Sequence, residues 1–148
     1  MIRIPKDFRD FLKLLNQNEV EYLIVGGYAV GLYGYPRATG DIDVWISQSK
    51  ENAYKIINVL TEFGFNQNDM LIEFFITDNQ ITRLGLPPLR IEIMTSISGL
   101  NFSECFPKRE IIEMDDIKIN FLDFNNLVVN KKAAGRFKDL DDLEKLTL

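Results

Sequence analysis

Histidine is absent from the sequence, and cysteine occurs once, at Cys105. Without histidine, neither a Ser-His-Asp nor a Cys-His mechanism is available, and a zinc site with histidine ligands is excluded. A single cysteine forms no disulfide within the chain, which favours a reducing, cytoplasmic setting. Catalysis by this chain would therefore rest on carboxylates, lysine, arginine, tyrosine or serine.

Long apolar runs are also missing, since no segment approaches the ~18 residues that a membrane-spanning helix needs. Residues 1–15 carry scattered charges, which argues against a secretory signal. The formal net charge is −5, so a broad electrostatic footprint on duplex DNA is not expected, although a local basic patch is compatible with it. We therefore expect neither a membrane nor duplex DNA among the partners.

The apolar residues follow helical spacing in some segments and form strand-like runs in others. Together these patterns predict an α+β fold, with a small mixed β-sheet flanked by helices. The 148 residues fit a single domain, 1–148, that is long enough to bury a core. Apolar residues at helical spacing predict helices over residues 5–18, 28–33 and 50–63, and two more that are capped by Asp123 and Asp139. Strand-like runs bounded by turn residues occur at 21–25, 41–47, 71–76, 81–84, 89–95, 110–114 and 117–121, the last two as a hairpin.

The segment from Leu23 to Ile46 organises the prediction of function. Within it, Asp41 and Asp43 open an apolar strand, and side chains two positions apart in a strand point to the same side, ~6.6 Å apart. Two unneutralised carboxylates at that spacing repel each other, so a divalent cation such as Mg²⁺ or Mn²⁺ between them is the favoured interpretation. The alternative is a solvated acidic pair at a strand edge.

Glu92, in the apolar strand predicted over residues 89–95, is the candidate for a third carboxylate. A lone acid inside an apolar strand is costly unless it is paired or bound to a metal. Sites that hold two metal ions for phosphoryl transfer need such a third ligand, which also serves as a base towards an attacking hydroxyl. The alternative is that Glu92 forms an ion pair with Arg90 or Arg37.

Gly26 and Gly27 join a predicted strand to a predicted helix. Without Cβ atoms, the backbone can approach a ligand closely, and the N–H groups at the helix start face an anion. A nucleoside triphosphate (NTP) fits this turn, although the glycine spacing of dinucleotide-binding and P-loop motifs is absent. Arg37 and Thr39, just before the aspartates, are placed to orient the metal site or the phosphates. The alternative is a tight turn with no ligand.

Cationic side chains gather near the C-terminus, at Lys131, Lys132, Arg136 and Lys138. Lys131 continues the apolar face of its predicted helix, so we expect it to point inward and to suit phosphate binding, whereas Lys132 points to solvent. Arg136 and Lys138 are further candidates for binding the nucleotide. The alternative is a solvated basic helix end that interacts with the helix dipole.

Together these residues resemble a known family. The glycine pair, the segment RATGDIDV and an acid on a later strand are similar to the nucleotidyltransferase fold of the DNA polymerase β superfamily. More narrowly, the chain resembles the small bacterial and archaeal nucleotidyltransferase-like proteins related to the toxin of abortive-infection toxin–antitoxin pairs. The resemblance runs from about Leu23 to Leu146 and includes the closing segment NKKAAGRFKDLDDLEKL.

The resemblance implies two Mg²⁺ ions held by three acids. It also implies transfer of a nucleoside monophosphate from an NTP such as ATP to a hydroxyl group, with release of pyrophosphate. The residues that match the family's metal ligands, phosphate turn and phosphate-contacting lysine are Asp41, Asp43, Glu92, Gly26, Gly27 and Lys131.

Two positions depart from the family's pattern. Many relatives have Gly-Ser where this chain has Gly26-Gly27, which removes a hydroxyl contact to phosphate, and the third acid is more often aspartate than glutamate. We therefore keep two hypotheses. The first is a nucleotidyltransferase that modifies a protein or RNA acceptor, tRNA included, and belongs to a toxin–antitoxin system with an antitoxin partner. The second is a nucleotide- or partner-binding module of the same fold with weak or no activity.

Overall fold

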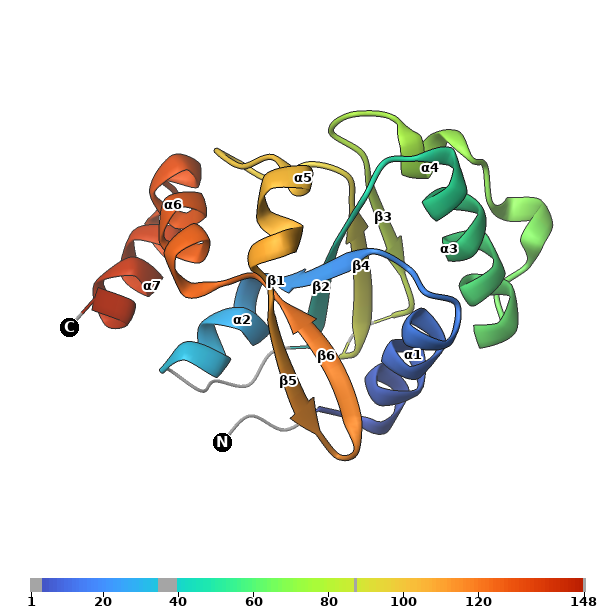
Figure 1. Ribbon diagram of the computed structural model, residues 1–148, viewed down its shortest axis with the longest axis horizontal. Helices are drawn as coiled ribbons and strands as arrows, with labels where there is room; N and C mark the ends of the chain where they lie inside the picture. Colours follow the sequence, from blue (N-terminus) through green and yellow to red (C-terminus); the bar gives the residue numbers. More distant parts are fainter. Residues whose placement is uncertain (1–3, 35–39, 87, 148) are drawn as a thin grey trace.

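The computed structural model describes residues 4–34, 40–86 and 88–147, and within them six strands form one mixed sheet in the order β3-β4-β2-β1-β6-β5 (Figure 1). β2 and β4 run parallel, as do β1 and β6, and the other neighbouring pairs are antiparallel. The prediction of an α+β fold with a mixed sheet is confirmed. The strands are β1 (Tyr22–Val25), β2 (Asp41–Ile46), β3 (Ile81–Leu84), β4 (Arg90–Met94), β5 (Glu110–Met114) and β6 (Ile117–Phe121).

Helices cover both faces of this sheet (Figure 1). They are α1 (Lys6–Gln17), α2 (Gly26–Tyr33), α3 (Lys50–Phe63), α4 (Glu73–Ile76), α5 (Phe102–Cys105), α6 (Phe124–Ala134) and α7 (Phe137–Thr147), with short 3-10 turns at Gln67–Asp69 and Phe106–Lys108. α1 and α3 pack together on one side of the sheet, whereas α5, α6 and α7 lie on the other. No helix in the described part of the chain is long and apolar enough to cross a membrane.

Local signals in the sequence explain several of these boundaries. Ser49 accepts a hydrogen bond from a backbone N–H in the first turn of α3 (3.1 Å), and Gly64 ends this helix with φ +119°. Asp123 caps α6 in the same way (3.3 Å). The hairpin of β5 and β6 turns at Asp115 and Asp116, both of which have positive φ.

Side chains alternate along β2 between the two faces of the sheet. Its isoleucine and valine side chains are almost completely buried in the core on one face. Asp41 and Asp43 point to the opposite face. On that same face Trp45 packs edge-to-face against Phe102 of α5, with 5.2 Å between the ring centroids. The acids therefore lie on the side of the sheet that α5, α6 and α7 occupy.

The strand predicted over residues 71–76 is wrong, because this segment contains α4. Phe75 is completely buried there, so the apolar run packs into the core as a helical turn. A short apolar run does not by itself distinguish a strand from a buried turn of helix, and no partner strand fixes this one.

The predicted start of the last helix is also wrong. α7 begins at Phe137, and Asp139 lies in its first turn, where it accepts a hydrogen bond from the backbone N–H of Arg136 (3.3 Å). The side chain reaches back to the residue before the helix, as in a capping box, instead of capping from outside. Leu140 is consequently 48% exposed, and α7 turns Asp139 and Asp142 inward.

Candidate active site

Three acidic side chains meet on one face of the β2–β4 pair. The parallel register places Asp43 directly opposite Glu92 and Asp41 opposite Arg90. Because register partners on adjacent strands point to the same side of a sheet, Asp41, Asp43 and Glu92 share one face. The structure thus brings the predicted third acid beside the predicted pair, from a strand that lies much later in the chain.

The glycine turn adjoins this acidic face. β1 runs antiparallel to β2 with Val25 opposite Asp43, and the chain then enters α2 at Gly26. Gly26 has φ +67°, and a Cβ atom at this position would overlap Oδ2 of Asp43. Glycine is therefore required here both for its left-handed backbone and for the close approach of the Asp43 carboxylate.

The surroundings of Asp43 strongly raise the pKa of its carboxyl group. Its pKa is raised to about 7, first by burial and then by the charge of Glu92, a hydrogen bond with Glu92 and the charge of Asp41, while the charge of Lys138 opposes the shift. Asp43 Oδ1 is buried and has no hydrogen-bond partner among the described residues. A bound cation would give this buried carboxylate oxygen a partner and would also neutralise the charge of the neighbouring acids.

Two arginines stand beside the acids. Arg90 donates from Nε to Asp41 Oδ1 (3.3 Å) and from Nη2 to Asp41 Oδ2 (3.2 Å), and the same Nη2 lies 3.7 Å from Glu92 Oε1. Arg83 of β3 donates from Nε to Glu92 Oε1 (3.2 Å). The ion pair between Glu92 and Arg90, which the sequence leaves open as the alternative, is therefore present together with the proximity of the acids.

Lys131 points inward, as its position on the helix predicts. Its side chain is 4% exposed, and Nζ lies 3.2 Å from Asp139 Oδ1 and 3.3 Å from Asp142 Oδ2. Burial would raise the pKa of Asp139, but hydrogen bonds from Arg136 and Lys131 outweigh it and lower this pKa. We call Lys131, Asp139 and Asp142 the α6–α7 ion cluster, because it joins the two helices through buried charges.

The two other candidate cations lie on α7 or just before it. Arg136 donates from Nε to Asp139 Oδ2 (2.6 Å), and its side chain is 73% exposed. The hydrogen bond to Asp139 raises the pKa of Arg136, and the charge of Asp43 adds to this effect. Since Lys138 in turn acts on Asp43, both cations lie within electrostatic range of the acidic face. Lys132 is exposed, as predicted.

Comparison with known proteins identifies the family of this chain. The family described as "Nucleotidyltransferase of unknown function (DUF6036)" matches residues 3–148. The chain belongs to this nucleotidyltransferase family. No sequence match to a curated protein was found.

Solved structures place this nucleotidyltransferase among proteins of the same fold. It is similar to a protein from Thermotoga maritima assigned as a nucleotidyltransferase, with 20% identity, a TM-score of 0.64, and coverage of 95% of this chain and 89% of that one. It is also similar to the lincosamide antibiotic adenylyltransferase LnuA, whose structure has lincomycin bound, with 16% identity, a TM-score of 0.58, and coverage of 97% and 96%. At these identities the likeness shows the fold alone.

The acidic face of the nucleotidyltransferase fits a divalent cation in its donor set. Asp41, Asp43 and Glu92 offer carboxylate oxygens, which Mg²⁺ prefers, and Asp43 Oδ1 is left without a partner. In the described parts of the chain, however, no three acidic or cysteine side chains converge closely enough to hold a metal ion. Asp41 and Glu92 are engaged by Arg90 and Arg83. The chemistry of the ligands fits, and the ligands are not preassembled.

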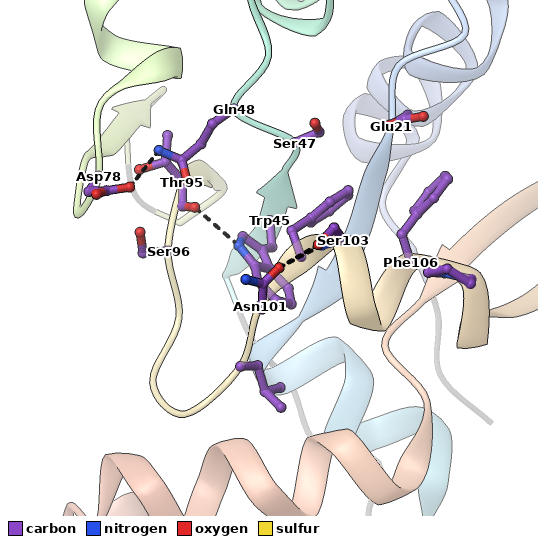
Figure 2. A pocket seen from close by; sticks show the side chains of 13 residues that line it. Glu21, Trp45, Ser47, Gln48, Asp78, Thr95, Ser96, Asn101, Ser103 and Phe106 are labelled. Atoms are coloured by element: carbon purple, nitrogen blue, oxygen red, sulfur yellow. Dashed lines mark hydrogen bonds between the residues drawn. The ribbon is translucent and has the colours of Figure 1, made fainter.

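A separate cavity of about 550 Å³ lies beyond the C-terminal ends of β2 and β4 (Figure 2). Trp45 Nε1 donates to the Thr95 carbonyl (3.3 Å) at its wall, and Gln48 Nε2 donates to Asp78 Oδ1 (2.8 Å). None of the three acids of the candidate site lines this cavity. It adjoins the opposite end of β2 from Asp41.

Some predicted site residues lie outside the described residues, and some site residues were not predicted. Arg37 and Thr39 fall in the segment 35–39, outside the described ranges. Sequence reasoning missed the contact of Arg83 with Glu92, for which no signal exists, because it depends on the register of β3. It also missed the partners of Lys131, although a buried lysine needs acidic partners and two aspartates follow on the next helix.

Proposed function

We propose that this chain, acting as a single domain, is a metal-dependent nucleotidyltransferase that moves a nucleoside monophosphate from an NTP, such as ATP, to a hydroxyl group. The shared face of Asp41, Asp43 and Glu92 beside the Gly26 turn is the observation that carries this function. Carboxylates so placed suit Mg²⁺ or Mn²⁺, and a glycine turn at a helix start suits a triphosphate. A cytoplasmic setting, expected from the single cysteine, stays a prediction.

The proposed phosphate contacts come from two sides of the acidic face. Gly26 and Gly27 present the first backbone N–H groups of α2 to phosphate oxygens. Arg136 and Lys138 supply positive charge from the α6–α7 side. A contact of Lys131 with phosphate stays a prediction. Its buried ion pairs with Asp139 and Asp142 favour a different role, which is to hold α7 against α6. The roles of Arg37 and Thr39 stay predictions as well.

The proposed transfer needs one nucleophile and one base. The acceptor hydroxyl oxygen bonds to the α-phosphorus, the bond from that phosphorus to the bridging oxygen breaks, and pyrophosphate leaves. Glu92 is assigned to accept the hydroxyl proton, because it lies across from Asp43 on the same face. Asp41 and Asp43, with Glu92, would hold the divalent cation. When bound, that cation neutralises charge that develops on the phosphate oxygens.

The acceptor is proposed by class. The family resemblance supports a hydroxyl group of a protein or an RNA, tRNA included, and a toxin–antitoxin role with an antitoxin partner. LnuA is an adenylyltransferase named for a lincosamide antibiotic. Its similar fold supports testing small-molecule hydroxyls as a further class of acceptor. The net charge of −5 favours acceptors other than long duplex nucleic acid.

A second candidate function is a nucleotide- or partner-binding module with weak or no activity. The ion pairs of Asp41 with Arg90 and of Glu92 with Arg83 favour it, because these carboxylates are already engaged. Glutamate at the position of the third acid supports the same alternative, since its carboxylate lies one methylene further from the backbone than that of aspartate.

Incubation with each α-³²P-labelled NTP, Mg²⁺ and protein, RNA and small-molecule acceptors separates the two functions. The nucleotidyltransferase predicts transfer of label that disappears with EDTA and in the variant Asp43→Asn, while Asp69→Asn, at an exposed site in the 3-10 turn Gln67–Asp69, retains it. Circular dichroism of both variants checks that they fold. NTP binding that survives EDTA, without any transfer of label, would instead establish the binding module.

A further inference from the structure

Arg90 occupies a position within the acid site that the proposed reaction does not use. In the parallel β2–β4 register it is the partner of Asp41, so the two side chains lie on the face that also carries Asp43. Its guanidinium forms two hydrogen bonds with Asp41, at 3.3 Å and 3.2 Å, and reaches to 3.7 Å from Glu92. One cationic side chain thus bridges two of the three proposed metal ligands.

The Arg90–Asp41 pair is accessible to solvent. The Arg90 side chain is 33% exposed and the Asp41 side chain 39%. Water therefore screens the pair and can solvate both charges when they separate, so such a pair contributes little net stability. The α6–α7 ion cluster, whose side chains are at most 4% exposed, has no such freedom. Among these charged contacts, the Arg90–Asp41 pair is suited to exchange.

A divalent cation and a guanidinium are alternative partners for the same carboxylate. The two oxygens of Asp41 each accept one N–H of Arg90, so a cation that takes either oxygen must compete with this bidentate contact. Asp43 differs, because Oδ1 is buried and without a hydrogen-bond partner among the described residues. A cation would therefore meet an open ligand at Asp43 and an engaged ligand at Asp41.

We propose that Arg90 is an exchangeable counter-ion of the acid site: it holds Asp41 while no divalent cation is bound and must release this carboxylate before the metal site is complete. Arg90 thereby sets the concentration of divalent cation at which the site fills. It is a regulatory residue of this site and not a catalytic one. The inference rests on the proposed function only in requiring that the acids bind a metal ion.

Arg83 supplies a matched control. It also contacts an acid of the site, at 3.2 Å from Glu92, but through a single hydrogen bond and with a side chain that is 57% exposed. Lysine variants separate two effects of the arginine, since lysine keeps the charge and loses the planar, bidentate contact. Simple repulsion between arginine and metal predicts that Arg90→Lys resembles the wild type, whereas exchange predicts that it binds metal more tightly.

Binding of Mn²⁺ to the nucleotide-free protein, measured by electron paramagnetic resonance of the free ion, tests the exchange. We expect Arg90→Gln to bind Mn²⁺ about two- to tenfold more tightly than the wild type, Arg90→Lys to show part of this gain, and Arg83→Lys to stay within about twofold of the wild type, since exposed ion pairs contribute little. Thermal unfolding in EDTA verifies that all variants fold.

Four results would overturn the inference. Weaker Mn²⁺ binding by Arg90→Gln would make Arg90 a support of the site. A gain in Arg90→Gln that is absent from Arg90→Lys would show a charge effect without exchange. Wild-type binding that neither variant changes would overturn the exchange and leave the proposed function standing, whereas no Mn²⁺ binding by any of the proteins would overturn the metal-dependent function as well.

Discussion

Asp43 and Glu92 are direct partners in the parallel register of β2 and β4, and a hydrogen bond with Glu92 contributes to the raised pKa of Asp43. Two carboxyl groups so close do not both ionise freely. Either one of them keeps its proton or a cation lies between them. The pH at which the metal-free protein is examined therefore affects its stability as well as its affinity for metal.

Replacement of Asp43 by asparagine should stabilise the metal-free protein at pH 8. An unfolded aspartate titrates near pH 3.9, whereas the pKa of Asp43 in the fold is raised to about 7, first by burial. The folded chain thus holds this proton more tightly, so its stabilising effect is complete below the unfolded pKa and is lost as the pH rises through about 7. We expect Asp43→Asn to gain on the order of 4 kcal/mol at pH 8 and less than about 1 kcal/mol near pH 4.

Thermal or urea unfolding in EDTA at the two pH values measures this gain. Asp69→Asn is the control, because the side chain of Asp69 is exposed and lies in a 3-10 turn away from the acids. Equal stability of Asp43→Asn and the wild type across the whole pH range would contradict the raised pKa. The same variant should lose activity, so that stability and function change in opposite directions at this position.

Replacement of Glu92 by glutamine should lower the pKa of Asp43. Burial remains in the variant, but the charge of Glu92, the second cause of the shift, is removed. We expect the midpoint of Asp43 to fall by about one unit, which corresponds to roughly 1.4 kcal/mol between its protonation states. Carboxyl ¹³C resonances followed by NMR between pH 3 and pH 9 report this midpoint directly. A midpoint that does not move would assign the shift to burial and the charge of Asp41, without a contribution from Glu92.

Replacement of Gly26 by alanine should destabilise the fold and disturb Asp43. The left-handed backbone at φ +67° costs a residue with a Cβ atom about 1–2 kcal/mol, and the new methyl group would also overlap the Asp43 carboxylate. Gly135 provides a matched control, since its φ is +63° and the nearest atom to an added Cβ is an ordinary 3.7 Å away. Gly135→Ala should pay only the backbone cost.

The difference between the two glycine variants isolates the contact with Asp43. We expect Gly26→Ala to be less stable than Gly135→Ala by about 1–3 kcal/mol in chemical unfolding, the usual range for overpacking. Equal losses in the two variants would mean that the Asp43 side chain moves aside at no cost, and the glycine would then matter for its backbone conformation alone.

Replacement of Lys131 by methionine should destabilise the protein strongly. The side chains of Asp139 and Asp142 are 1% and 0% exposed, and the variant leaves them without the ammonium group at 3.2 Å and 3.3 Å. Loss of one partner from a buried ion pair costs about 3–5 kcal/mol. Lys132→Met, one residue along at an exposed position, should change stability by less than about 0.5 kcal/mol. Similar stability of the two variants would argue against the ion cluster.

The shared face of the three acids was predictable from the sequence because its spacing rules are local. Asp41 and Asp43 are two residues apart in a strand, and that separation alone puts them on one face. Glu92 was found through the cost of an acid in an apolar strand, which is also a local argument. The glycine turn was predictable because Gly26 and Gly27 lie between a segment with strand character and one with helix character.

Features that depend on contacts between distant elements were not predictable. The bidentate contact of Arg90 with Asp41 follows from the register between β2 and β4, which no single segment encodes. The apolar run at 71–76 has the composition of a strand, yet it packs into the core as α4. Asp139 was predicted to cap the last helix from outside, whereas α7 in fact turns Asp139 and Asp142 inward toward Lys131.

The position of β1 in the sheet has a consequence for how the chain acquires its structure. β1 lies between β2, which follows it closely, and β6, which is made much later, and the backbone N–H of Asn120 meets the Tyr22 hydroxyl across 98 positions of sequence (3.4 Å). During synthesis β1 can pair with β2 early, but its other edge stays open until β6 leaves the ribosome. Such long-range pairing slows folding and leaves an unpaired strand edge exposed meanwhile. The open edge of β1 is therefore available for incorrect strand pairing until translation has passed β6.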